Sequence, residues 1–69
     1  MNHLHRQLVT EHRTVVLVDN PNGRITVRRD RGAFHLKMWD KQYKKRTTTL
    51  RKTLKGAIET AEFAKESYL

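Results

Sequence analysis

Residues 23–49, GRITVRRDRGAFHLKMWDKQYKKRTTT, decide the fold, because apolar and polar residues alternate along most of this stretch. Alternation with a period of two is typical of a β-strand that buries one face. The turn sequences DRG at 30–32 and DKQ at 40–42 interrupt the alternation. The strands predicted from this pattern are 24–29, 33–39 and 43–50, the last favoured by its three consecutive threonines.

The sequence on either side adds one strand and one helix. Residues 14–18, TVVLV, predict a strand, and DNPNG at 19–23 predicts a hairpin turn in which Asn22-Gly23 tolerates positive φ. At Thr53, the expected N-cap, the apolar period changes from two to about 3.6. The helical stripe that follows consists of Leu54, Ala57, Ile58, Ala61, Ala64 and Tyr68. Residues 1–12 form either a short helix or a frayed end, and the pattern leaves both open.

These elements predict an α+β fold for residues 1–69, which form a single small domain. We expect an antiparallel sheet of three to four strands, with the C-terminal amphipathic helix packed on one face. Side chains alternate between the two faces of a strand. The helix-covered face is predicted to hold Ile25, Val27, Phe34, Leu36, Met38 and Leu50. The opposite, open face is predicted to hold Arg24, Thr26, Arg28, His35, Lys37, Trp39, Lys45, Thr47 and Thr49.

The net charge is +8 and its distribution is uneven. Residues 24–55 contain twelve Lys and Arg and two Asp, which gives this block +10, whereas the first 23 residues balance and the last 14 are acidic. A basic block with neutral and acidic flanks indicates a directed surface for a polyanion. Lys suits phosphate contacts, Arg can also bond a guanine edge, and Thr can contact a thymine methyl group. The candidate nucleic-acid-binding residues are Arg24, Thr26, Arg28, His35, Lys37, Trp39, Lys45 and Thr47.

The segment FHLKMWDKQYKKRTTTLRKTLKGAIETAEFA, residues 34–64, places basic strands ahead of an alanine-rich helix. In this pattern, residues 23–68 resemble the arm-type DNA-binding domains of phage tyrosine integrases and the DNA-binding domain of plant ethylene-response factors. Two features depart from those families: Arg51-Lys52 separates the last strand from the helix, and TVVLV adds a strand in front.

The resemblance implies that the open sheet face enters the major groove of duplex DNA. It maps the contacts onto Arg24, Thr26, Arg28, Lys37, Trp39 and Lys45. Because the chain carries no integrase catalytic domain, the implied role is that of a small phage or mobile-element regulator or accessory factor, without recombinase chemistry. We expect no enzyme activity, no cofactor and no metal, since the chain has no Cys and Ser67 is its single serine.

Two other classes of function stay open. If the N-terminal residues form a helix, the order helix, strands, helix resembles a double-stranded RNA-binding domain, with Arg51, Lys52 and Lys55 as the available basic cluster. Alternatively, the chain is a small inhibitor or adaptor that docks on an acidic protein surface. We expect a cytoplasmic location, nucleoid-associated if the source is a bacterium or phage, and no membrane partner. The oligomeric state is not predicted.

Overall fold

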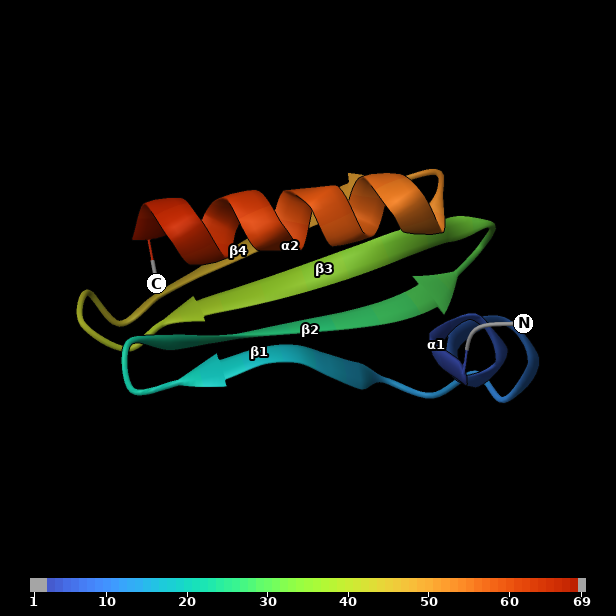
Figure 1. The fold of residues 1–69 in the computed structure, drawn as a ribbon, viewed down its shortest axis with the longest axis horizontal. Coiled ribbons are helices and arrows are strands. Elements are labelled where there is room, and N and C mark those ends of the chain that lie inside the picture. Colours follow the sequence, from blue (N-terminus) through green and yellow to red (C-terminus); the bar gives the residue numbers. More distant parts are fainter. Residues whose placement is uncertain (1–2, 69) are drawn as a thin grey trace.

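The computed structural model describes residues 3–68 and, of these, the side chains up to Ser67. A four-stranded antiparallel sheet with the order β1-β2-β3-β4 carries one long helix, α2, on one face (Figure 1). The strands are β1 (Val15–Asn20), β2 (Gly23–Asp30), β3 (Ala33–Asp40) and β4 (Lys45–Arg51), and α2 spans Leu54–Tyr68. The predicted α+β fold is therefore confirmed, and each strand lies within two residues of its expected bounds.

Polar side chains and left-handed residues close the three turns of this meander. Asn20 Oδ1 accepts hydrogen bonds from the backbone N–H groups of Asn22 and Gly23 at 2.9 and 3.0 Å, and Asp40 Oδ1 does the same in the β3–β4 turn. Arg31 and Gly32 have φ of 53° and 77°, as a two-residue hairpin turn with two positive φ values requires. The DNPNG hairpin is present as predicted, but without positive φ at Asn22 or Gly23. The Asn20 side chain fixes that turn instead.

Strand β1 contains a β-bulge that the uniform TVVLV sequence does not reveal. Val15 pairs with Val27 and Val18 pairs with Ile25, so the register shifts by one residue between Val16 and Val18. An extra residue in one strand bends it and changes which side chains point inward. As a result Val15, Leu17 and Val18 all pack against the core, which strict alternation would not allow.

The core lies between the sheet and α2, where alanines allow a close approach. Its fully buried centre consists of Leu8, Ile25, Val27, Leu36 and Ala57, with Phe34, Ala61 and Ala64 at 6% exposure or less. Thr53 is the N-cap of α2, as predicted, because its Oγ1 accepts the N–H of Gly56 at 3.0 Å. Arg51 Nε donates to Thr60 Oγ1 at 2.9 Å and so joins the end of β4 to the middle of α2.

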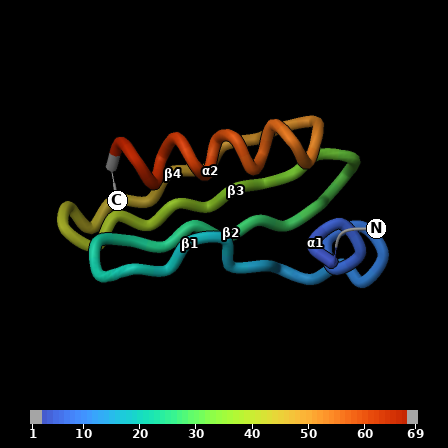
Figure 2. The backbone as a smooth tube through the Cα atoms, in the orientation of Figure 1, coloured from blue at the N-terminus to red at the C-terminus, as the bar shows by residue number. Residues whose placement is uncertain are grey.

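In the part of the chain that the structure describes, the N-terminal residues form a short helical segment. The segment comprises α1 (His3–His5) and a π-helical stretch, η1 (Arg6–Thr10), whereas residues 1 and 2 lie outside the described chain. It sits at the end of the sheet where β1 begins and β2 ends, opposite to the C-terminal end of α2 (Figures 1 and 2). Leu8 is 0% exposed there, so this segment closes the end of the core that α2 leaves open.

The predicted faces hold for β2 and β3 but are wrong for β4. Met38 pairs with Thr47, Leu36 with Thr49 and His35 with Leu50. Residues directly opposite each other in a sheet share a face. Thr47, Thr49 and Lys45 therefore lie on the helix side, and Leu50, at 54% exposure, lies on the open side. The threonine triplet contains no alternation that could set the register, so the prediction depended on Leu50 alone, whose side chain is not buried.

Candidate nucleic-acid interface

The open face is built from three cross-strand rows of side chains on β2, β3 and β4. Adjacent strands lie about 4.8 Å apart and rows about 7 Å apart, so the patch measures about 10 by 14 Å. The registers of the two hairpins give the rows Arg24–Trp39–Arg46, Thr26–Lys37–Thr48 and Arg28–His35–Leu50. Each row carries at least one Lys or Arg side chain, and all four of these side chains are exposed.

The first row holds an aromatic ring between two guanidinium groups. Trp39 lies directly opposite Arg24 of β2 and directly opposite Arg46 of β4. The Arg46 guanidinium carbon lies 5.9 Å from the centroid of the Trp39 ring, within the range of a cation–π contact. Trp39 is only partly buried and does not belong to the core cluster. The arrangement orients Arg46 across the face and leaves a flat, polarisable surface beside it.

The second and third rows form a small hollow of about 70 Å³. Thr26, Arg28, His35 and Lys37 line it as two cross-strand pairs, and Thr14 closes it from the segment before β1. At about 30 Å³ for each water molecule, the hollow holds about two waters, which suits a tetrahedral oxyanion better than a base. The two exposed cations, Arg28 and Lys37, and the hydroxyl groups of Thr14 and Thr26 supply the chemistry that such an anion needs.

Carboxylates occur at the margins of this face rather than within the three rows. Asp19 pairs with Arg24 across the β1–β2 ladder, and its carboxylate lies 3.7 Å from Lys41 Nζ. Asp30 Oδ2 lies 3.8 Å from Arg28 Nη2, a long contact between two half-exposed side chains. The backbone carbonyl of Asp30 also accepts from His35 Nε2 at 3.2 Å when that nitrogen carries the proton. Exposed pairs of this kind contribute little, so Arg28 stays free to bind another anion.

Six of the eight residues selected from the sequence lie together on this face. They are Arg24, Thr26, Arg28, His35, Lys37 and Trp39. Lys45 and Thr47 lie on the helix side of the sheet, because the register of β4 differs by one residue from the predicted one. The same shift brings in Arg46 and Thr48, which sequence reasoning missed. Only the pairing of β4 with β3 could have found them, since the KKRTTT run offers no preference for either face.

The comparisons with known proteins gave no match to a family model, a curated protein or a solved structure. A function is therefore inferred from the side chains of the open face. Of the helices in residues 3–68, none combines the length and the apolar character needed to cross a membrane.

Proposed function

We propose that this protein binds duplex DNA through the open face of its sheet. The three rows of side chains on β2, β3 and β4 carry the proposal, because they gather four exposed cations and an aromatic ring on one side of the molecule. Neutralising several phosphates releases condensed counterions, which gives such a surface its affinity. The acidic groups at its margins, Asp19 and Asp30, leave the centre of the patch positive.

The dimensions of the patch suit the major groove. That groove is about 12 Å wide and admits a two-stranded β-ribbon, so the β2–β3 hairpin can enter it while β4 faces one wall. The guanidinium groups of Arg24 and Arg46 can each bond a guanine edge through two hydrogen bonds, which Lys cannot reproduce. Lys37 and Arg28 then contact phosphate at the 70 Å³ hollow, which they share with Thr26 and His35.

The proposal extends to the setting in which the protein acts. A small DNA-binding domain fits a regulator or accessory factor, and the resemblance of residues 23–68 to integrase arm domains supports a phage or mobile element as its source. Such a protein acts in the cytoplasm, on the nucleoid if the host is a bacterium.

A pair of adjacent substitutions in β4 tests the interface. Arg46 lies on the open face and Lys45 on the helix side, although both are exposed cations on the same strand. We expect Arg46→Ala, which removes a contact to a guanine edge, to weaken duplex DNA binding by about 1–3 kcal/mol. Lys45→Ala changes affinity much less. The measurement is fluorescence anisotropy of a labelled duplex between 50 and 200 mM salt.

An RNA duplex of equal length runs in parallel, because the described chain also has the order helix, strands, helix of the RNA alternative. Equal or tighter RNA binding replaces DNA by RNA as the ligand. If Arg46→Ala and Lys45→Ala lose the same amount of DNA affinity, the DNA is attracted by the overall positive charge and does not bind the open face specifically. Absence of binding to either duplex at low salt removes both nucleic-acid functions and favours an acidic protein partner.

A further inference from the structure

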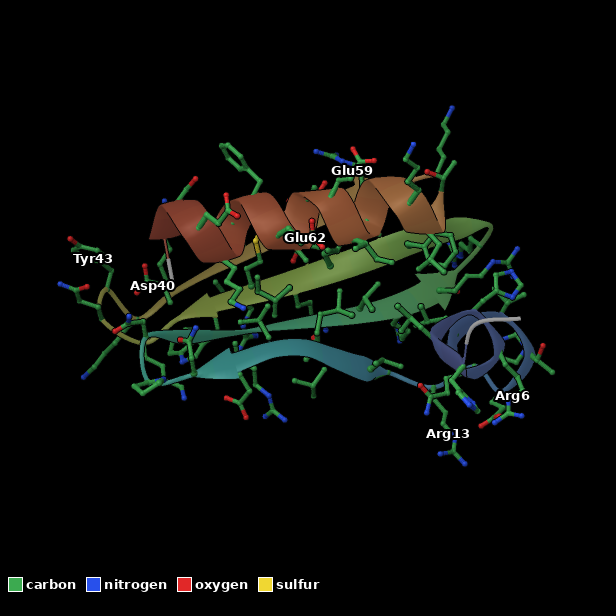
Figure 3. All side chains as sticks on the ribbon, viewed as in Figure 1. Arg6, Arg13, Asp40, Tyr43, Glu59 and Glu62 are labelled. Carbon is green, nitrogen blue, oxygen red and sulfur yellow. The ribbon has the colours of Figure 1, made fainter. Side chains whose placement is uncertain are left out.

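A second surface lies on the helix side of the sheet, between α2 and the edge strand β4. A groove of about 720 Å³ runs there, and we name it the β4 groove. Thr47 and Thr49 line it from β4, Thr60 and Phe63 from α2, and Met38 from β3, with Tyr43 at the β3–β4 turn. Figure 3 shows Tyr43 and Asp40 together at that end of the molecule. The groove exists because the facing side chains are short: threonines on β4 and Thr60 and Ala64 on α2 do not fill the space.

Two large aromatic residues border this groove without being buried. Phe63 is 64% exposed and Tyr43 is 75% exposed. Neither contributes to the core, whose α2 side consists of Leu54 and the alanines at 57, 61 and 64. Exposed apolar side chains that gather beside a groove mark an interaction site rather than a structural need.

The backbone of β4 is available next to the groove. In the order β1-β2-β3-β4, β4 has a neighbour on one side only, so half of its backbone N–H and C=O groups point outward. The other edge strand, β1, is interrupted by its bulge and followed by Pro21, two features that discourage strand addition. In contrast, β4 keeps one unbroken register with β3 from Lys45 to Arg51. A regular edge of this length can accept another extended segment.

The positive charge of β4 favours an acidic ligand at this edge. Residues 44–52 contain five Lys and Arg and no Asp or Glu. A strand laid beside β4 meets cations on both of its faces, because Lys45 points to the helix side and Arg46 to the open side. A second copy of this chain is a poor occupant, since antiparallel pairing of two β4 strands about Thr48 sets Lys45 against Arg51 of the other copy. Like charges placed directly opposite destabilise a sheet.

We propose that β4 and the β4 groove receive an extended acidic segment of a partner protein. The segment adds a fifth strand along β4 through backbone hydrogen bonds, and every second side chain points to the helix side. There an apolar side chain enters the groove and packs against Phe63, while the carboxylates of the alternate residues point to the open side, where Arg46 lies. The groove lies on the helix side of the sheet and the proposed DNA interface on the opposite face, and the two surfaces meet at Trp39 and Arg46. The protein would then link nucleic acid to a second protein.

The test uses a defined peptide and the intact chain. An end-blocked peptide of about eight residues, a common strand length, alternates Asp and Leu. It is titrated into ¹⁵N-labelled protein, and amide shifts and hydrogen exchange are followed. We expect shifts at β4 and Phe63 and slower exchange of β4 amides. The same peptide with Lys in place of Asp, or with a central Pro that interrupts the ladder, is expected not to bind.

Variants of the protein test whether the peptide binds in the groove. Phe63→Ala removes an exposed wall and leaves the core intact, so we expect a normal thermal melt and about tenfold weaker peptide binding, the scale of truncating an aromatic anchor. Val16→Ala is the matched control, because Val16 is an exposed apolar residue on β1, at the other edge of the sheet. It is expected to bind like the parent.

Several results overturn the proposal. They are equal binding of the Asp and Lys peptides, shifts centred on Thr26 and Lys37 instead of β4, and equal losses for the two variants. A concentration-dependent dimer whose interface is β4 replaces the acidic partner by a second copy. Slower exchange of β4 amides with duplex DNA, but not with the Asp peptide, assigns the edge to nucleic acid. DNA binding by the open face is measured separately and stands or falls on its own.

Discussion

The two faces of the same sheet have opposite chemistry, although the residues that form them alternate along the same strands. On the helix side Ile25, Val27 and Leu36 are fully buried. On the open side their immediate neighbours Arg24, Arg28 and Lys37 are exposed. Strands β2 and β3 therefore contribute to stability with one residue and to a charged surface with the next. We therefore expect substitutions at adjacent positions of β2 and β3 to affect different properties: the stability of the fold at one position and the affinity for DNA at the next.

The largest expected effect is on the covered face, at Leu36. Leu36→Ala leaves a cavity among residues that cannot collapse fully, so the free energy of unfolding should fall by about 2–5 kcal/mol. A small domain has about 5–15 kcal/mol in total, so this is a large share. Lys37→Ala, one residue further, should change stability by no more than about 0.5 kcal/mol. Urea unfolding monitored by circular dichroism measures both. Similar losses for the two variants would break the division between the faces.

A smaller effect, this time on binding, is expected at Trp39. Its ring lies on the open face between Arg24 and Arg46 and outside the core cluster. Trp39→Ala should therefore weaken duplex DNA binding by about 2 kcal/mol, the scale of a desolvated cation–π contact, because the ring orients Arg46. The loss of stability should be smaller, and Trp39→Phe should retain most of the binding. Anisotropy titrations and thermal melts of the same samples decide the matter. If Trp39→Ala loses more stability than DNA affinity, the role of Trp39 is to pack on the sheet and not to contact DNA.

The smallest effect is expected at the N-cap of α2. Thr53→Ala removes the acceptor for the Gly56 N–H and should lower the free energy of unfolding by about 1 kcal/mol. DNA affinity should not change, because Thr53 lies outside the three rows of the open face. Thr53→Ser keeps the hydroxyl and should behave like the parent in urea unfolding. A fall in affinity without a fall in stability would connect the start of α2 to the ligand.

The sequence predicts β2 and β3 well because their apolar and polar residues alternate without exception from Arg24 to Val27 and from Phe34 to Met38. That alternation sets both the strand and its face. It also predicts the face of the sheet on which six of the eight candidate residues lie, from Arg24 to Trp39. When apolar and polar residues alternate along a strand and one face of the sheet is buried, the sequence alone therefore predicts which residues lie on which face.

Where alternation is missing, the sequence does not set the face. In β4, Thr47, Thr48 and Thr49 suit either side, and a slip of one residue exchanges the two faces completely. Lys45 and Thr47 were assigned to the open face for this reason, in place of Arg46 and Thr48. In β1 the opposite problem occurs: the apolar run VVLV, residues 15–18, does not reveal the bulge at Leu17. The burial of Leu8 depends on contacts distant in sequence, which local patterns do not contain.

The core joins Leu8, from the N-terminal helical segment, to Ala64, near the end of α2. During synthesis, the three hairpins can form one after another, because every strand pairs with its neighbour in the sequence. Yet the hydrophobic cluster is complete only after residue 64 has left the ribosome. Until then Ile25, Val27 and Leu36 cannot pack against the alanines of α2. A nascent chain stalled before α2 should therefore be sensitive to proteases, and one extended past α2 should become resistant in a single step.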